Sequence, residues 1–342
     1  MTTIAVTGAA GAVGSRTIRR LSADLAVTRV IALDQAPQTH PTEGDRVVVK
    51  RMDVLAGDLA GAFTGVDSVV HLAEDGSRRG DAGAALLLLN TVLEAVERSE
   101  VRHLVVLSSA AVYGAHADNP IPLTESEQLR PNIELEFAMT KQLIESRSSD
   151  WAARHNRDLA IMRPTTTVSE TGVSWVAAAI RAAASVRPDQ ADPPVQFLHH
   201  EDLSSALALV ARQRLSGAFN VAPDGWIGPE AFRELIGGVQ VRVPVQVSDR
   251  LLAAGRRFGI RPTPEGIEPY VRYPWVVAND RLRGAGWAPS LSNEETFVIS
   301  MPSPPWAMSA QRRQEVALGV AGFGVAGAAA MAAALARKLS KP

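Results

Sequence analysis

The sequence predicts an α/β fold in which helices cover both faces of a doubly wound, parallel β-sheet. Three observations lead to this prediction. Short apolar segments alternate with longer helical patterns through the first half of the 342-residue chain. The short segments are apolar almost throughout, as strands covered on both faces must be. The first of them ends in a glycine-rich turn, and a helical pattern follows directly.

Six short runs are the strand candidates. In chain order they are TIAVTG, VTRVIALD, RVVVKRMD, VDSVVHLA, VRHLVVLSS and LAIMRP. Between them lie helix candidates at residues 12–21, 82–99 and 133–155. Because strand and helix alternate, we expect right-handed crossovers between parallel strands.

Beyond the last of these strands the alternation loosens and prolines accumulate, which indicates a smaller, irregular C-terminal lobe. We expect a sheet domain over residues 1–165 that also receives residues 195–222. The lobe is then formed by residues 166–194 and 223–300.

The chain ends in an apolar tract. Residues 301–315 are expected to form a Pro-rich linker, and the 21 residues 316–336 carry no charge. As a helix this tract is about 30 Å long, enough for the core of a bilayer. A helix that is apolar all round must be buried in lipid or in protein. We favour a transmembrane helix that anchors the protein C-terminally at the cytoplasmic face of the membrane, because the N-terminus lacks an export signal. A helix packed on the domain is the alternative.

Charge and composition exclude several kinds of function. The 35 basic and 36 acidic residues nearly balance, so the chain lacks the basic excess of a nucleic-acid-binding protein. It has no cysteine, which excludes disulfides, thiolate catalysis and cysteine-ligated zinc. We predict no metal site at HHED, residues 199–202, because consecutive side chains rarely converge on one ion. Asp202 is instead expected to cap a helix over residues 203–212.

The glycine turn TGAAGAVG has the spacing of a dinucleotide site. Its first glycine permits a tight turn, its second lets the backbone approach a pyrophosphate, and its third lets the helix pack close to the strand. The start of that helix offers N–H groups and a positive dipole to phosphates. The sequence therefore predicts a Rossmann-type cofactor site, formed here by Thr7, Gly8, Gly11, Ala12, Val13 and Gly14.

Two aspartates extend this site. Asp34 ends the second strand candidate, 20 residues after Gly14. A carboxylate there can accept hydrogen bonds from both ribose hydroxyls of NAD and would repel the 2′-phosphate of NADP, so NAD is the expected cofactor. Asp53 follows the third strand candidate and is placed to meet the adenine amino group. Each aspartate could instead serve only as a turn cap.

With these residues identified, the sequence resembles the extended short-chain dehydrogenase/reductases, which include NAD-dependent nucleotide-sugar epimerases and dehydratases. The resemblance runs from about residue 4 to about residue 297. Besides the glycine turn, it rests on the ordered motifs HLA (71–73), LSSAAVYG (107–114), PLTESEQLRPN (122–132), MRP (162–164), VQFLHHEDLSSAL (195–207), GAFNVAPD (217–224) and LRGAGWAPSLSNEE (282–295).

The resemblance implies a catalytic set from which one member is missing. The family's serine, which hydrogen-bonds the substrate oxygen, corresponds to Ser109. Its lysine, which binds the nicotinamide ribose and lowers the pKa of a tyrosine, corresponds to Lys141. The tyrosine itself, the acid/base, is replaced by Phe137. Further cofactor contacts are implied at Val54, Leu72, Ala73, Lys141 and Pro164.

Two hypotheses on function follow. The chain is either an oxidoreductase or epimerase/dehydratase-like enzyme acting on an unidentified small molecule or lipid, or a catalytically silent NAD-binding scaffold or redox sensor at the membrane. General acid–base catalysis typically contributes about 10²–10⁴-fold, so loss of the phenol predicts severely impaired hydride transfer between alcohols and ketones.

Other departures bear on the substrate and on partners. Val195 replaces a frequent arginine, and Thr165 and Thr166 follow MRP, which weakens the assignment to a nucleotide sugar. The apolar helix at residues 83–96 either packs on the sheet or joins two copies in a homodimer.

Overall fold

The computed structural model describes residues 2–37, 46–73, 82–170, 172–173, 186–188, 192–236, 241–243 and 265–300. The predicted linker at 301–315 and the predicted apolar helix at 316–336 lie outside these residues. Within the described part of the chain, no helix is both long and apolar enough to cross a membrane.

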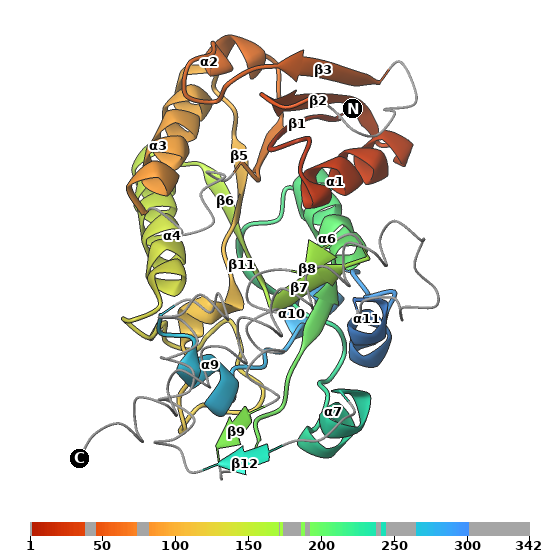
Figure 1. The fold of residues 1–342 in the computed structure, drawn as a ribbon. Helices are drawn as coiled ribbons and strands as arrows, with labels where there is room; N and C mark the ends of the chain where they lie inside the picture. Colours follow the sequence, from red (N-terminus) through yellow and green to blue (C-terminus); the bar gives the residue numbers. More distant parts are fainter. Residues whose placement is uncertain are drawn as a thin grey trace, which may run out of the picture.

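The centre of the fold is a seven-stranded sheet in the order β11-β6-β5-β4-β1-β2-β3 (Figure 1). Each strand is parallel to its neighbours. This confirms the predicted α/β class with a parallel sheet. The order reverses at β1, so the crevice between β1 and β4 is the point where such sheets bind ligands. The strands are β1 (Thr2–Thr7), β2 (Val27–Asp34), β3 (Val47–Arg51), β4 (Ser68–His71), β5 (His103–Leu107), β6 (Asp158–Pro164) and β11 (Gly217–Val221).

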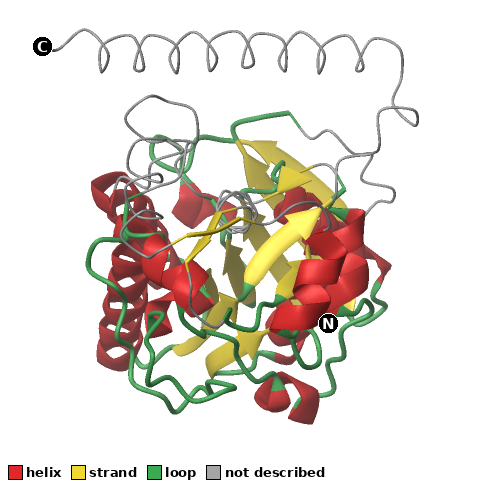
Figure 2. Ribbon diagram, turned by 60° about the horizontal axis from the view of Figure 1, so that its bottom comes forward, coloured by secondary structure: helices red, strands yellow, loops and turns green. Residues whose placement is uncertain are grey.

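Helices cover the sheet on both sides, which gives three layers (Figure 2). On one face lie α2 (Leu59–Ala62), α3 (Ala82–Arg98) and α4 (Glu136–His155). On the other lie α1 (Ala12–Ala23) and α6 (His200–Gln213). Successive side chains along each strand point to opposite faces of the sheet and therefore pack against the two helix layers in turn.

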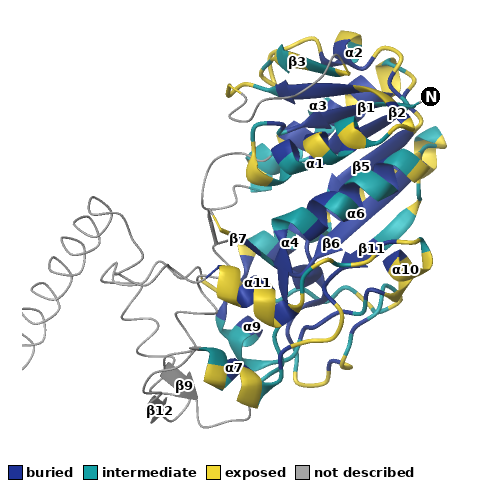
Figure 3. Cartoon of the chain, turned by 90° about the vertical axis from the view of Figure 1, so that its right-hand side faces the viewer, coloured by how far each residue is buried: buried dark blue, intermediate teal, exposed yellow. Residues whose placement is uncertain are grey.

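Strand β1 shows this alternation directly. Ala5 packs in the core beneath α3 and α4, whereas Ile4 and Val6 pack in the core beneath α1 and α6. All three side chains are fully buried, as are most residues of the central strands (Figure 3). Burial on both faces is the reason why these runs are apolar throughout rather than alternating.

Two helix starts differ from the sequence predictions. Helix α4 begins at Glu136, three residues later than predicted, because Leu135 has extended backbone and Ile133 is 76% exposed. Helix α6 begins at His200, and the side chain of His199 caps it by accepting a hydrogen bond from the Glu201 N–H at 3.2 Å.

The prediction that Asp202 caps this helix is therefore wrong. Asp202 lies inside the first turn of α6 and is 1% exposed. Its carboxylate accepts hydrogen bonds from the N–H groups of Ser290, at 2.8 Å, and Leu291, at 3.2 Å. It thus ties α6 to a distant segment of the chain. No group of three or more metal-ligating side chains is found among the described residues.

The remaining described residues form short elements beyond the sheet. They comprise the strand group β10 (Phe197–His199), β7 (Thr166–Ser169) and β8 (Gly172–Val173), the pair β12 (Val241–Val243) and β9 (Val186–Pro188), the 3₁₀ helix η1 (Ala110–Tyr113), and the helices α7 (Pro229–Ile236), α9 (Glu268–Arg272), α10 (Asp280–Gly284) and α11 (Asn293–Ile299). Aromatic side chains hold this region together. The rings of Phe197, Phe232 and Phe297 pack with centroids 5.0–5.8 Å apart.

Candidate functional site

The glycine turn brings three segments into close contact. Gly8 has φ +71°, and a side chain on it would lie 2.6 Å from the carbonyl carbon of Leu72, just after β4. A side chain on Gly14 would lie 2.1 Å from the carbonyl oxygen of Gly8. Only glycine therefore lets the turn press against β4 and α1 press against the turn. A cradle for phosphate groups forms at the start of α1.

A cleft of about 490 Å³ opens beside this turn, at the carboxyl ends of β1, β2, β3 and β4. Its position coincides with the reversal of strand order, where sheets of this type bind ligands. Most of the residues predicted from the sequence to contact the cofactor line it: Gly8, Gly11, Ala12, Val13, Gly14, Asp34, Asp53, Val54, Leu72 and Ala73.

Asp34 and Asp53 lie in the cleft wall and also cap turns. The two carboxylate oxygens of Asp34 accept hydrogen bonds from the N–H groups of Ala10, at 2.9 Å, and Ala36, at 2.8 Å. Asp53 accepts one from the N–H of Leu55 at 2.9 Å. Each carboxylate oxygen has a second lone pair, so these bonds orient the aspartates and leave them able to accept from a ligand.

Three of the predicted contacts do not line the cleft, namely Thr7, Pro164 and Lys141. Thr7 is fully buried, and its hydroxyl pairs with Nδ1 of His71 at 2.8 Å, which joins β1 to β4. Pro164 is buried at the end of β6, where it pairs with Val221 of β11.

The sequence analysis missed part of the opposite wall. Ala84, Leu87 and Leu88 of α3 line the cleft, and Leu87 is 55% exposed. Their spacing places them on one face of the helix. The apolar run had been interpreted as a packing or dimer face. The spacing alone could not show that this face also borders a cleft, because that depends on where α3 meets β3 and β4.

The positions predicted to be catalytic lie near the end of β5. Lys141 of α4 is 6% exposed and donates a hydrogen bond from Nζ to the carbonyl oxygen of Leu107 at 3.1 Å. Leu107 itself lines the cofactor cleft. Ser109 follows β5, is 8% exposed, and caps η1 by accepting a hydrogen bond from the Ala111 N–H at 3.2 Å. The structure thus brings Lys141 and Ser109 to the same strand end.

Phe137 lies one helical turn before Lys141. The Lys141 Nζ is 5.6 Å from the centroid of the Phe137 ring, within the range of a cation–π contact. The ring is partly buried, against the core that includes Leu135 and Ala138. This position therefore keeps an aromatic face toward the lysine and has no group that can exchange a proton.

Tyr113 and Tyr270 are placed to serve the fold and not proton transfer. The Tyr113 hydroxyl donates to Oδ1 of Asn220 at 2.8 Å, and the Tyr270 hydroxyl donates to the carbonyl oxygen of Ala111 at 2.8 Å. Burial raises the pKa of both phenols. A phenol that is buried, hydrogen-bonded and harder to ionise is poorly suited to act as a base.

Gly14→Ala is expected to disrupt the cleft. The new methyl group cannot fit 2.1 Å from a backbone oxygen, so α1 must move away from the turn. We expect a loss of about 1–3 kcal/mol in the free energy of unfolding, measured by denaturant titration. Gly284→Ala in α10 is the matched control, because a Cβ there would meet no atom of the described part of the chain within 4 Å. Equal stability of the two variants would contradict the close packing of α1 on the turn.

A comparison with protein families identifies the chain. Residues 4–222, more than half of its length, match the model of the NAD dependent epimerase/dehydratase family. The chain belongs to this family. Its curated relatives include uncharacterized proteins from Mycobacterium tuberculosis and Mycobacterium bovis, each 25% identical over 321 residues, which cover 86% of this chain and 82% of the relative.

Solved structures of similar fold include proteins named as sugar-nucleotide epimerases or solved with UDP-linked sugars. MoeE5 in complex with UDP-glucuronic acid and NAD is 20% identical, with a TM-score of 0.64 over 87% of this chain and 97% of that one. UDP-glucose 4-epimerase from Thermotoga maritima is 15% identical, with a TM-score of 0.63 and the same coverage. A tyrosine-to-phenylalanine variant of UDP-glucuronic acid 4-epimerase from Bacillus cereus, bound to UDP-4-deoxy-4-fluoro-glucuronic acid and NAD, is 16% identical, with a TM-score of 0.64 over 87% and 98% of the chains.

As a member of the epimerase/dehydratase family, the chain keeps the predicted cofactor cleft and the lysine and serine positions, but has Phe137 where the family resemblance places a tyrosine. The matched region contains the glycine turn, the cleft-lining strand ends, Ser109 and Lys141. It ends just after β11, so the family match covers the sheet domain and not the elements from α7 onward.

Proposed function

We propose that this protein is an NAD-dependent oxidoreductase of the epimerase/dehydratase type, in which residue 137 takes no part in proton transfer. The observation that carries the proposal is the hydrogen bond from Lys141 to the carbonyl oxygen of Leu107. This bond holds the buried ammonium group of Lys141 at the edge of the cofactor cleft. Its acceptor, Leu107, is two residues before Ser109 in the sequence. A protein that used NAD only for structure would not need both groups at this strand end.

The residues of the cleft fit NAD. The glycine turn carries no side chains at Gly8, Gly11 and Gly14, so its backbone and the start of α1 can approach a pyrophosphate closely. Asp34 presents its carboxylate to the cleft where the adenosine ribose would bind. Lys141 would hold the nicotinamide ribose. When bound, NAD supplies the hydride acceptor, and the protein supplies orientation and electrostatics.

The role of Ser109 is to orient the reacting oxygen of the substrate. Its Oγ accepts a hydrogen bond from the Ala111 N–H, so its O–H remains able to donate to a substrate oxygen. The missing phenol leaves proton transfer to a bound water or to a group on the substrate. Turnover is then expected to be slow but not absent.

Sugar nucleotides are the first substrates to test, because the similar solved structures bind UDP-linked sugars. The Bacillus cereus variant carries phenylalanine in place of one tyrosine and is solved with both NAD and a sugar nucleotide, which supports binding without full catalysis. Val195 stands where sugar-nucleotide enzymes often have an arginine, and this difference favours a substrate other than a nucleotide sugar.

The test is hydride transfer to bound NAD. The NAD-loaded protein is mixed with UDP-glucose, UDP-glucuronic acid and simple secondary alcohols, and absorbance of the reduced cofactor and epimerised product are recorded. We expect slow turnover of one class and its loss in Lys141→Met, because the nicotinamide ribose loses its partner. Lys50→Met, on the edge strand β3, is the control and should change nothing. Turnover that survives in Lys141→Met would contradict the assigned role.

A catalytically silent NAD-binding scaffold is the second candidate, and Phe137 is the observation that favours it. Absence of reduced cofactor and of product with every substrate, in a protein that binds NAD, would support the scaffold. Anchoring at the cytoplasmic face of a membrane by residues 316–336, and pairing of two copies through α3, stay proposals that rest on the sequence.

A further inference from the structure

Three residues of helix α4 follow one another at four-residue spacing and so share one face: Phe137, Lys141 and Glu145. The first two lie at the catalytic positions. Glu145 lies one turn further along and is 3% exposed. A carboxylate is rarely buried so deeply unless it has partners that compensate for the loss of water.

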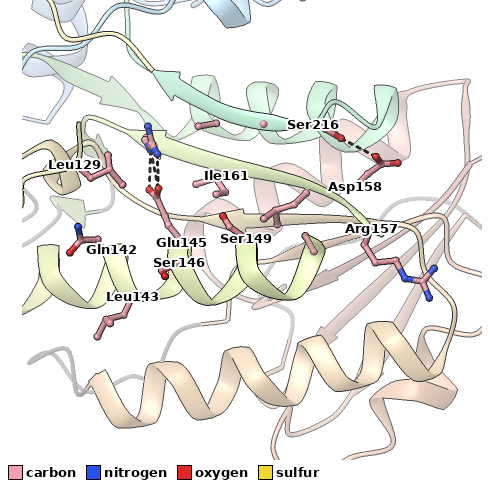
Figure 4. Close-up of a pocket in the computed structure, with 15 residues that line it drawn as sticks. Leu129, Gln142, Leu143, Glu145, Ser146, Ser149, Arg157, Asp158, Ile161 and Ser216 are labelled. Carbon is pink, nitrogen blue, oxygen red and sulfur yellow. Dashed lines mark hydrogen bonds and ion pairs between the residues drawn. The ribbon is translucent and has the colours of Figure 1, made fainter. Parts of the chain in front are cut away.

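Glu145 has two partners, Ser108 directly after β5 and Arg163 on β6. The Ser108 hydroxyl donates to its Oε1 at 2.5 Å. Arg163 of β6, itself 6% exposed, donates from Nε to Oε1 at 3.0 Å and from Nη2 to Oε2 at 2.6 Å. Figure 4 shows this bidentate contact, with dashed lines at Glu145, between the helix and the strand. Glu145 therefore joins α4 to both β5 and β6 through charged hydrogen bonds, which are the strong ones.

Ser108 lies between the two groups that matter for the site. The residue before it, Leu107, supplies the carbonyl oxygen that holds Lys141. The residue after it is Ser109, which would hold the substrate. The Ser108 N–H also donates to the carbonyl oxygen of Met162 at 2.8 Å, so its backbone is fixed to β6. Through Ser108, Glu145 sets the position of the strand end that carries both groups.

The same network reaches the far end of η1. Arg163 donates from Nη1 to the Tyr113 hydroxyl at 2.8 Å, and Tyr113 in turn donates to Asn220 of β11 at 2.8 Å. Ser109 caps the start of η1 and Tyr113 ends it. Both ends of the segment that carries Ser109 are thus fixed by the Glu145–Arg163 pair.

We propose that Glu145 is a positioning residue, which acts through Ser108 to hold Lys141 and Ser109 in register with the cofactor cleft. The inference rests on the proposed function, since it concerns the groups that would hold NAD and substrate. A buried ion pair contributes little net stability compared with apolar residues of similar size. The role of the Glu145–Arg163 pair is instead to fix the position of α4 relative to β6 and the end of β5. Binding and catalytic groups depend on such supporting contacts for their geometry.

The first test separates positioning from stability. Glu145→Leu alone leaves the Arg163 charge buried without its partner and should lower the melting temperature by about 10 °C. The double variant Glu145→Leu/Arg163→Met removes both charges and should melt close to the wild type. We nevertheless expect about tenfold weaker NAD binding by calorimetry in the double variant, because Ser108 has lost its acceptor. Wild-type NAD affinity in this variant would overturn the proposal.

The second test holds even if the double variant does not fold. Ser108→Ala removes one hydroxyl and leaves the ion pair intact; it should weaken NAD binding severalfold. In a Lys141→Met background, Ser108→Ala should not weaken NAD binding further, because the effect of Ser108 on NAD binding passes through Lys141. The control is Ser148→Ala, which removes a fully buried hydroxyl of α4 that has no hydrogen-bond partner among the described residues.

The outcomes of the two tests distinguish the inference from the proposed function. An equal loss on Ser108→Ala with and without Lys141 would overturn the positioning role. So would a loss of the same size on Ser148→Ala. A wild-type protein that binds no NAD would overturn the proposed function and the inference together. A wild type that binds NAD tightly, with variants that bind equally well, would overturn the inference alone.

Discussion

Phe137→Tyr is expected to raise the rate of hydride transfer by about 10²–10⁴-fold on any alcohol that the wild type oxidises slowly. The added hydroxyl lies one turn from Lys141, whose Nζ is already 5.6 Å from the centre of the ring. A phenol beside an ammonium group has a lowered pKa, as a catalytic base near neutral pH requires. The measurement is single-turnover reduction of bound NAD.

The matched control for this variant is Phe137→Leu. It removes the ring without adding a proton donor and should not raise the rate. The double variant Phe137→Tyr/Lys141→Met should lose most of the gain, because the phenol is then harder to ionise. If the wild type already equals Phe137→Tyr, another group moves the proton in this protein and the phenol at residue 137 was never needed.

Asp34→Arg is expected to reverse the choice of cofactor. The carboxylate that would accept from both ribose hydroxyls is replaced by a cation that attracts the 2′-phosphate of NADP. Hydrogen bonds to a charged group contribute about 1.5–3 kcal/mol each, so loss of both bonds should lower NAD affinity by about 100-fold or more. NADP affinity should rise at the same time, and calorimetric titration measures both.

The control for this change is Asp34→Asn. Asp34 also accepts hydrogen bonds from the N–H groups of Ala10 and Ala36, so any substitution affects the turn. Asparagine keeps one acceptor oxygen and removes the charge, and it should weaken NAD binding without a gain for NADP. If Asp34→Arg left both affinities unchanged, Asp34 would serve only as a turn cap, through its hydrogen bonds to backbone N–H groups.

The sheet and the cofactor cleft could be predicted because their signals are local in the sequence. A strand that is covered on both faces is apolar throughout, and the glycine turn is contiguous with the strand and helix that it joins. The ends of parallel strands meet at one edge of the sheet, so Gly8 and Asp34 could be assigned to one site from their strand-end positions, whereas Ala73 was implied by the family resemblance.

The rest depended on contacts between distant residues. Asp202 has the residue type and place of a helix cap, yet its partners are Ser290 and Leu291, 88 and 89 residues away. Glu145 carries no signal in the sequence beyond its place on a helix, because its partners Ser108 and Arg163 lie far from it in the chain, after β5 and on β6. The α3 wall of the cleft was missed for the same reason.

Calorimetric titration of the nucleotide-free protein with NAD and, separately, with NADP is the decisive test of the cofactor site. We expect tight binding of NAD, much weaker binding of NADP, and loss of the NAD signal in Asp34→Arg. Binding of neither nucleotide would contradict this expectation, because the cleft beside the glycine turn would then be a remnant of the fold and not a cofactor site.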